Sequence, residues 1–577
     1  MRTRTPIGYV VEVNHGIISL NLLAEQQGQV ASHFQGITSV GDVGSLLAVE
    51  GGERLYVFKV TGLKFLEPRE VHNPSLNSRK TNNEPLRQIH GSIIGWLNDR
   101  GFNPDSMSSP TLGAQAFPLS KEESARVIGG SIPSNELTLG KEIRTGVDVT
   151  STLNNLLAQH VAVLGSSGQG KTGFTAAILQ QLAVKPNSRI VVFDINGEYD
   201  KAFRSIDEPQ RYLIENERYQ QTVIGGTEAN GLKIPYYALG REGLARLLLP
   251  SEKTQRPALS FAIKNLPYVE WDESLGGAKL HGGEVCLFDD CRSECAQEAS
   301  AAIALLRAGD AHHTQSWPHM SALGPLIADS YSLARRGQSF ERAQFQYSNI
   351  SPLITRLHRL IEDPQFNAVV NLEGRTNPEE RTLADESKDF VGKIFGTSDS
   401  RWNVHVVNLK MVPQDLMPLI LGSVLELYAQ TLFQRGQGAS SPTLLVLEEA
   451  HHYLRPMPDG DSMESSLAYE RLAKEGRKFG LSLWLSTQRP SEVSPTVLSQ
   501  CNTWVTFKLN SEKDLNAVSN ACEWADRKEI SRITGLARQH AIIFGGATKV
   551  PICIKSPTAN PTPDSSDGDF DSWSVAR

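Results

Sequence analysis

The feature that most constrains this chain is a glycine-rich loop of eight residues between an apolar run and an amphipathic segment. The loop reads Gly165-Ser166-Ser167-Gly168-Gln169-Gly170-Lys171-Thr172. It follows residues 161–164, which are typical of a buried strand, and precedes residues 174–179, which are typical of a helix. Strand, glycine loop and helix in this order are the context that the phosphate-binding P-loop requires. The pattern therefore predicts a nucleotide site rather than a chance glycine-rich turn.

Each part of such a loop has a chemical role. Its glycines let the backbone fold tightly, so that several N–H groups and the helix N-terminus converge on one anion. Lys171 is expected to reach the β- and γ-phosphates of ATP, and the Thr172 hydroxyl is expected to hold Mg²⁺.

Length and charge bound the remaining possibilities. At 577 residues the chain is too long for a single core, so three or four domains are expected. The formal net charge is −7, from 57 basic and 64 acidic residues, which is not typical of a protein coated in nucleic acid. A narrow channel that grips nucleic acid stays possible, because only local charge matters there.

The sequence also indicates a compartment. The best candidate for a membrane span, residues 416–433, is interrupted by Glu426 and Gln430. The N-terminus has no apolar core of a signal peptide, and six cysteines are too few for a disulfide scaffold. We therefore expect a cytoplasmic protein with no membrane contact.

The N-terminal part predicts a small β-barrel. Residues 6–70 contain short β-branched runs separated by turn residues, and residues 9–13 and 17–20 form a plausible hairpin. Residues 71–135 are looser, with a short helix near residues 89–97. We expect residues 1–135 to form the barrel and a linker.

The residues after the P-loop helix predict a parallel sheet. Residues 189–194 read as a buried strand that ends in Asp194, and Glu198 lies in the turn that follows. Strand, helix and strand form a βαβ unit, whose functional residues gather at the carboxyl ends of the strands. Asp194 and Glu198 either help to polarise the attacking water or serve as a cap and a turn acid. Both interpretations stay open.

Residues 206–370 are mostly helical in pattern, which predicts an insertion domain. Three cysteines and four histidines lie in this segment: Cys286, Cys291, Cys295, His281, His312, His313 and His319. A zinc site needs four ligands at short, paired spacings, and no second clean pair is present. Reduced structural thiols are preferred to zinc.

A second strand motif completes the nucleotide site. Residues 444–447 are apolar, and Glu448 and Glu449 follow directly. In a P-loop ATPase the first acid supports hydrated Mg²⁺, and the second activates water. Glu448 stands where many such enzymes have Asp.

Two further segments carry candidate residues. Arg477, followed by Lys478, is either a solvated basic helix end or an arginine finger for the γ-phosphate of a neighbouring subunit. Gln488 follows the strand predicted at residues 481–485 and can sense the γ-phosphate by hydrogen bonding. A strand is expected at residues 504–509, and a hairpin at residues 541–544 and 550–554. Residues 556–577 are expected to be a disordered acidic tail.

Assembled in this order, these motifs resemble the HerA family of hexameric DNA translocases, within the FtsK/HerA group of RecA-like ATPases. The resemblance rests on residues 165–172, 194–199, 448–451, 475–478 and 486–491, together with the N-terminal barrel. It implies an α/β fold: a RecA-like P-loop ATPase core with a mainly parallel sheet, a HAS-barrel-like N-terminal domain and a helical insertion domain. The core is expected at residues 136–205 and 371–555, with the insertion at 206–370 between them.

The resemblance also implies an activity and partners. It implies an ATPase that couples hydrolysis to DNA translocation or unwinding, assembled as a homohexamer with duplex DNA in the central pore. A nuclease or another effector is expected to dock on the barrel, in DNA end processing or antiphage defence. Gln169 stands where the family often has Ser. Arg241, Arg246 and Lys253 are candidate DNA contacts by charge alone, and solvated helix faces explain them equally well.

A different class of function stays open beside the motor. The ring would be a scaffold that activates an effector, with ATP controlling its assembly rather than driving long translocation. A transporter ATPase is disfavoured, because the chain contains no Leu-Ser-Gly-Gly-Gln signature.

Overall fold

The computed structural model describes residues 5–564 except 15, 24–29, 34–35, 40–41, 66–86, 100, 105–107, 129–135, 204–215, 228, 252, 310–316, 375–382, 398, 439–440, 457–467, 523–526 and 549. The chain divides into two compact units. The first unit comprises residues 1–158, 503–508 and 524–557, and the second comprises residues 159–502, 509–523 and 558–577.

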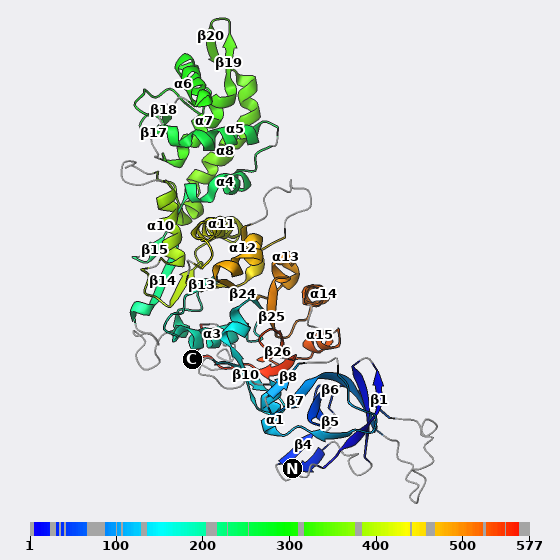
Figure 1. Cartoon of the computed structure of the whole chain (residues 1–577). Helices are drawn as coiled ribbons and strands as arrows, with labels where there is room; N and C mark the ends of the chain where they lie inside the picture. Colours follow the sequence, from blue (N-terminus) through cyan, green and yellow to red (C-terminus); the bar gives the residue numbers. More distant parts are fainter. Residues whose placement is uncertain are drawn as a thin grey trace, which may run out of the picture. The chain divides into compact units, whose positions relative to one another are not determined.

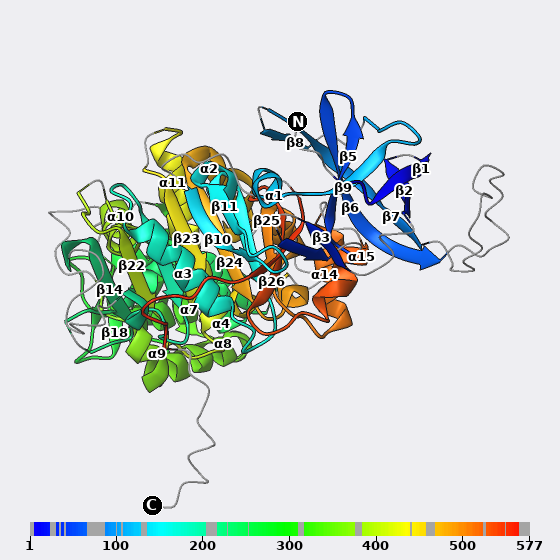
Figure 2. The same cartoon turned by 90° about the horizontal axis from the view of Figure 1, so that it is seen from below.

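In the first unit, six of the described strands close into an antiparallel barrel (Figure 2). Their order is β2–β1–β9–β5–β6–β7, β7 pairs back to β2, and β8 continues the sheet beyond β7. The bounds are β1 (Gly8–Asn14), β2 (Ile17–Leu22), β5 (Leu46–Gly51), β6 (Arg54–Phe65), β7 (Arg87–Asn98), β8 (Gly101–Asn103) and β9 (Gln115–Pro118). Buried side chains such as Ile18, Leu20, Phe58 and Ile89 fill the interior. The predicted hairpin and barrel are confirmed, and β3 (Val30–His33) and β4 (Gly36–Ser39) form a separate ribbon.

The short helix predicted near residues 89–97 is wrong, because β7 runs through this segment. Its residues alternate between buried and half-buried positions with the period of two that defines a strand. Gly91 and Gly95 occupy buried positions, where an added Cβ would lie 2.0 Å from the carbonyl oxygen of Lys59 and 2.2 Å from that of Asn103. These glycines permit the close approach of neighbouring strands. Because β7 and β9 both belong to the barrel, the barrel extends beyond the predicted residue 70.

The rest of the first unit connects the barrel to an antiparallel ladder. Helix α1 (Lys121–Ile128) begins with a capping box, in which Ser120 Oγ accepts from the N–H of Glu123 and Glu123 Oε2 accepts from the N–H of Ser120. The ladder order is β11–β10–β27–β26–β25. Its bounds are β10 (Glu136–Glu142), β11 (Asp148–Thr152), β25 (Cys501–Thr506), β26 (His540–Gly545) and β27 (Ile552–Lys555). In the chain, α2 (Leu153–Leu157) follows β11, and α15 (Arg527–Ile533) precedes β26. The hairpin predicted at residues 541–554 is confirmed.

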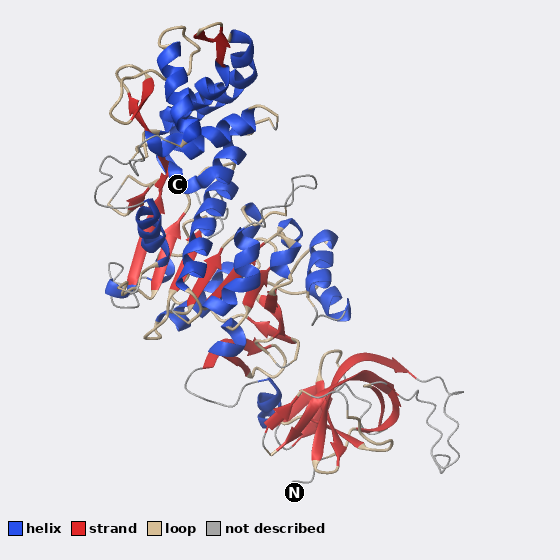
Figure 3. Ribbon diagram, turned by 45° about the horizontal axis from the view of Figure 1, so that its top comes forward, coloured by secondary structure: helices blue, strands red, loops and turns tan. Residues whose placement is uncertain are grey.

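The second unit is built on a parallel sheet of order β12–β24–β23–β13–β22–β14–β15, with helices packed against it (Figure 3). The bounds are β12 (His160–Leu164), β13 (Ile190–Asp194), β14 (Tyr219–Ile224), β15 (Gly231–Leu232), β22 (Val404–Asn408), β23 (Thr443–Leu447) and β24 (Leu481–Thr487). Every residue of β12, β13, β23 and β24 is buried, as expected of strands covered on both faces. The predicted RecA-like core with its mainly parallel sheet is confirmed.

Six helices between and after these strands belong to the same unit. They are α3 (Lys171–Ala183), α10 (Leu383–Phe395), α11 (Met417–Arg435), α12 (Ala468–Glu475), α13 (Pro495–Leu498) and α14 (Glu512–Ala521). Among the described residues, none of these or the other helices combines the length and apolarity that a bilayer span requires.

The predicted helical insertion is present between β15 and β22, shown in green in Figure 1. It contains α4 (Gly240–Leu248), α5 (Gln255–Asn265), α6 (Ala296–Ala308), α7 (Leu323–Ser332), α8 (Gln344–Glu362) and α9 (Pro364–Val369), and the hairpins β17–β18 (Val269–Asp272, Gly277–Leu280) and β19–β20 (Leu333–Arg336, Ser339–Arg342). A fully buried ion pair between Arg342 Nε and Asp329 Oδ1, 2.7 Å apart, ties β20 to α7. Strand β14 lies within the stretch expected to be helical but pairs with β22, so the core sheet reaches beyond residue 205.

The tail is not disordered where it is described. The backbone N–H of Asn560 donates to Gln180 Oε1, and Gln180 Nε2 donates to the carbonyl oxygen of Pro561. The N–H of Asp564 donates to the carbonyl oxygen of Glu198. The predicted disorder is therefore wrong for residues 556–564, because polar groups of α3 and of the turn after β13 bind this backbone. Residues 565–577 lie outside the described residues.

Candidate nucleotide-binding site

The P-loop connects β12 to α3 as the sequence predicts. Gly168 and Gly170 have φ angles of +69° and +112°, which favour glycine over residues with a side chain. Gly170 is the N-cap of α3 and has no side chain to cap it, so the first N–H groups of the helix stay available for an anion. The loop therefore has the backbone of a phosphate cradle.

Lys171 begins α3 and is 6% exposed. Its Nζ lies 3.4 Å from the carbonyl oxygen of Ser166. Burial lowers the pKa of Lys171, and the charges of Glu449, Glu448 and Glu198 oppose that shift. One ammonium thus lies among three carboxylates at the carboxyl edge of the sheet.

Glu448 follows β23 and is almost fully buried. Burial raises its pKa to about 7, and a hydrogen bond from the Tyr199 hydroxyl to Oε1 opposes that rise. The hydroxyl of Tyr453 donates to the backbone carbonyl of the same residue at 3.0 Å. A buried carboxylate of this kind is stabilised by a bound cation.

Thr172 follows Lys171 in α3, and Glu198 lies in the turn after β13. Burial raises the pKa of Glu198, the charge of Asp194 adds to the rise, and hydrogen bonding from the Thr172 side chain opposes it. The oxygens of Thr172, Glu198 and Glu448 are therefore hard donors near one phosphate cradle. This donor set fits Mg²⁺, which binds carboxylate and hydroxyl oxygens together with substrate phosphate.

Glu449 adopts a left-handed backbone conformation with φ 44°, which is strained for a residue with a side chain. Its Oε1 accepts a hydrogen bond from Gln488 Nε2 at 2.5 Å. Its Oε2 is buried without a hydrogen-bond partner among the described residues, although Nδ1 of His451 lies 3.3 Å away. Glu449 and Gln488 are thus brought together at the ends of the neighbouring strands β23 and β24.

Asp194 at the end of β13 and Glu198 in the turn after it make different contacts. The carboxylate of Asp194 accepts the backbone N–H groups of Gly197, Glu198 and Tyr199 at 2.8–3.1 Å. Asp194 is therefore a cap of the turn, whereas Glu198 reaches Thr172.

Arg477 does not join this site in its own chain. It is exposed on the turn at Gly476–Phe479 that precedes β24, whereas Gln488 follows the same strand. A strand of seven residues is about 20 Å long, which exceeds the reach of an arginine side chain. Its charge contributes to lowering the pKa of His160, which is lowered mainly by burial.

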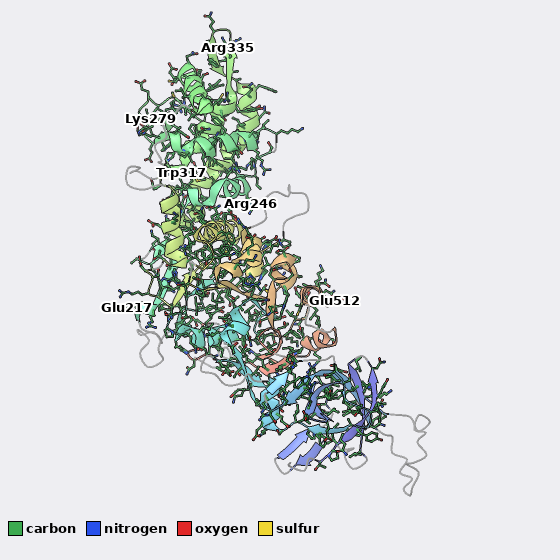
Figure 4. The ribbon with its side chains drawn as sticks, in the orientation of Figure 1. Glu217, Arg246, Lys279, Trp317, Arg335 and Glu512 are labelled. Carbon is green, nitrogen blue, oxygen red and sulfur yellow. The ribbon has the colours of Figure 1, made fainter. Side chains whose placement is uncertain are left out.

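The remaining candidates lie elsewhere. Arg241, Arg246 and Lys253 are exposed in the insertion, and Arg246 is labelled on α4 in Figure 4. Among the described residues, no three His, Cys, Asp or Glu side chains are grouped so that they alone could hold a metal ion, and Cys286, Cys291 and Cys295 are free thiols. His312 and His313 lie outside the described residues.

Sequence reasoning missed two residues of the site. Tyr199 contacts Glu448 from 249 positions away, and His451 approaches both Glu449 and Thr487 Oγ1, the latter at 3.1 Å. Tyr199 directly follows Glu198, and His451 lies two positions after Glu449. This proximity to predicted site residues was the only signal in the sequence.

The chain is similar to several known proteins. A family model described as "Helicase HerA, central domain" matches residues 137–427. The DNA double-strand break repair helicase HerA of Pyrococcus furiosus is 24% identical over 426 residues, which cover 72% of this chain and 68% of the relative. A probable helicase of Methanocaldococcus jannaschii is 21% identical over 534 residues, covering 90% and 86%.

Two solved structures are also similar. VirB4 of Thermoanaerobacter pseudethanolicus has a TM-score of 0.45 at 15% identity, covering 75% of this chain and 98% of that protein. The bacterial conjugative coupling protein TrwB, in a truncated form, has a TM-score of 0.43 at 10% identity, covering 77% and 94%.

Proposed function

The chain belongs to the family defined by the helicase HerA central domain, and we propose that it is a ring-forming ATPase that translocates along or unwinds duplex DNA. The observation that carries this proposal is the position of Lys171 in a phosphate cradle, among the carboxylates of Glu448, Glu449 and Glu198. Relatives that align with most of the chain are named as helicases, which supports DNA as the substrate.

The residues of the site divide the work of ATP hydrolysis. The N–H groups of residues 165–172 and the ammonium of Lys171 bind the phosphates. Thr172, Glu198 and Glu448 would hold Mg²⁺, which neutralises charge on the terminal phosphates. Glu449 orients and deprotonates the attacking water, and Gln488 binds either that water or the γ-phosphate.

Arg477 is proposed to act on the neighbouring subunit. It lies at the amino end of β24, away from the nucleotide site of its own chain. An arginine finger placed in trans would stabilise the charge of the transition state, so hydrolysis would require assembly.

The finer proposals concern assembly and partners. A homohexamer with duplex DNA in its pore follows from the family resemblance, as does an effector, such as a nuclease, docked on the barrel. DNA end processing and antiphage defence are the two settings consistent with such a pair.

The first experiment measures the ATPase rate of the purified chain with and without linear duplex DNA, alongside its mass in solution. A hexamer whose turnover rises severalfold with DNA is expected, and Glu449→Gln, which keeps the shape of the side chain, serves as the inactive control. A monomer without ATPase activity under all conditions would contradict the proposal.

A scaffold that activates an effector is the alternative, and the N-terminal barrel and the lack of any basic stretch in the sequence fit this idea. In this case ATP binding would be sufficient, and a ring of Glu449→Gln subunits would still activate its effector. A strict requirement for hydrolysis would favour the motor.

A further inference from the structure

A polar cavity of about 480 Å³ opens beside the P-loop. One wall is formed by Ser166 and Ser167 of the loop, and Gln488 lies next to them. The first turn of α14 also lines it, through Lys513 and Asp514. Because two P-loop residues line it, the cavity borders the proposed phosphate cradle.

The first turn of α14 is fixed to the loop that carries Gln488. Asp514 is 7% exposed, and its Oδ1 accepts hydrogen bonds from the backbone N–H of Ser491 at 3.1 Å and from Ser491 Oγ at 2.7 Å. Glu512, labelled in Figure 4, begins the helix. The backbone of Lys513 is therefore anchored by the residue that follows it, and its side chain is exposed at the cavity.

The charged residues of the cavity differ in their partners. Arg489 Nη1 is paired with Glu492 Oε1 at 2.8 Å, and Asp514 is bound by Ser491. Lys513 is exposed at the cavity and, within the described part of the chain, makes no ion pair or hydrogen bond with another side chain. A lysine in the first turn also lies at the positive end of the helix dipole, which is unfavourable for a cation. An anionic ligand in the cavity would compensate both features.

The charge balance of the site favours such a ligand contact. Lys171 is the cation among Glu198, Glu448 and Glu449, so the carboxylates outnumber the ammonium groups around it. A terminal phosphate placed there gains from a second ammonium that approaches from the cavity.

We propose that Lys513 binds the terminal phosphate of ATP from within the same chain and thereby distinguishes ATP from ADP. This role rests on the proposed function, since it presumes a triphosphate in the P-loop. It is separate from that of Arg477, which is assigned to a neighbouring subunit. Lys513 reports the presence of the third phosphate to the loop of Gln488 through Asp514 and Ser491.

The test is equilibrium binding of AMP-PNP and of ADP, each with Mg²⁺, to the full chain. Lys513→Met is expected to weaken AMP-PNP binding by about tenfold, the effect of one lost charge-assisted hydrogen bond, and to leave ADP binding unchanged. Lys513→Arg should retain most of the affinity. Lys393→Met removes an exposed lysine from the last turn of α10, and this matched control should bind both nucleotides as the native chain does.

Three outcomes would overturn the role of Lys513: unchanged binding of both nucleotides, an equal loss of both, or a loss confined to DNA binding. If the native chain bound ADP and AMP-PNP with equal affinity, the role of Lys513 would also be removed, although the nucleotide site itself would remain supported. A native chain that binds neither nucleotide would contradict the proposed function itself.

Discussion

The hydroxyl of Tyr199 donates a hydrogen bond to Oε1 of Glu448, which joins the turn after β13 to the end of β23. The backbone N–H of Tyr199 is itself bound to Asp194 at 2.9 Å. Asp194, Tyr199 and Glu448 thus form a continuous chain of contacts that fixes the proposed Mg²⁺ ligand from its buried side.

Removing this hydroxyl should weaken the metal site. In Tyr199→Phe, Glu448 loses a donor to its carboxylate, so its pKa rises further above about 7 and less of it is ionised at neutral pH. We expect the Mg²⁺ concentration for half-maximal ATPase activity to rise by about tenfold. Tyr453→Phe is the matched control, because that hydroxyl binds the backbone carbonyl of Glu448 and not its carboxylate. Equal Mg²⁺ dependence in the two variants would contradict the role of Tyr199.

The hydrogen bond between Gln488 and Glu449 leads to a second prediction. Gln488→Ala removes the donor to Glu449 Oε1 and the amide facing the cavity at the P-loop. We expect kcat to fall by about 10²-fold or more, with ATP binding nearly unchanged, because the amide acts on groups that change in the transition state. Gln500→Ala, an exposed substitution, is the control. A rise in KM with unchanged kcat would show that Gln488 only binds substrate.

The sequence predicted those parts of the site that lie within short motifs. Residues 165–172 and the pair Glu448–Glu449 each carry their own strand signal, so their positions at one sheet edge follow from the βαβ rule. The contacts of Tyr199 with Glu448 and of Glu198 with Thr172 join segments that are distant in the chain, and nothing local encodes them.

The errors in the fold have local causes. Strand β7 carries glycines at its buried positions, so its apolar alternation is weak and resembles a short helix. Strand β14 contains Gln220 and Gln221, which conceal the pattern of a core strand. Residues 556–564 have the composition of a disordered segment, yet the amide of Gln180 binds their backbone. In each segment tertiary contacts outweigh the local pattern.

His405 in β22 should make the stability of the second unit depend on pH. Its Nδ1 lies 2.7 Å from the carbonyl oxygen of Ile394, so Nδ1 carries the proton, and Nε2 accepts from Thr222 Oγ1 at 2.8 Å. Burial lowers the pKa of His405 to about 4, below its ordinary value of 6.5. The contribution is therefore complete above pH 6.5 and is lost as the pH falls toward 4.

The measurement is the thermal unfolding midpoint of the native chain and of His405→Gln between pH 7 and pH 4.5. The substitution should destabilise the protein at pH 7, and the difference should shrink on acidification as up to about 3 kcal/mol of linkage is removed. Parallel pH profiles would show that His405 does not titrate in this range.

The proposed placement of Arg477 and Glu449 on different subunits of one active interface gives the sharpest prediction. Rings of Glu449→Gln alone lack the base, and rings of Arg477→Ala alone lack the proposed finger, so both should be inactive. In mixed rings, an Arg477→Ala subunit keeps its own Glu449, and a neighbouring Glu449→Gln subunit supplies Arg477. Such an interface is complete, so ATPase activity should return when the two inactive proteins are mixed and reassembled. The control replaces Arg477→Ala with Lys478→Ala, which removes the exposed cation next to Arg477. Rings of Lys478→Ala alone should keep their ATPase activity, unlike rings of Arg477→Ala alone. If Arg477 acted within its own chain, or only stabilised the turn before β24, no mixture of the two inactive variants would regain turnover.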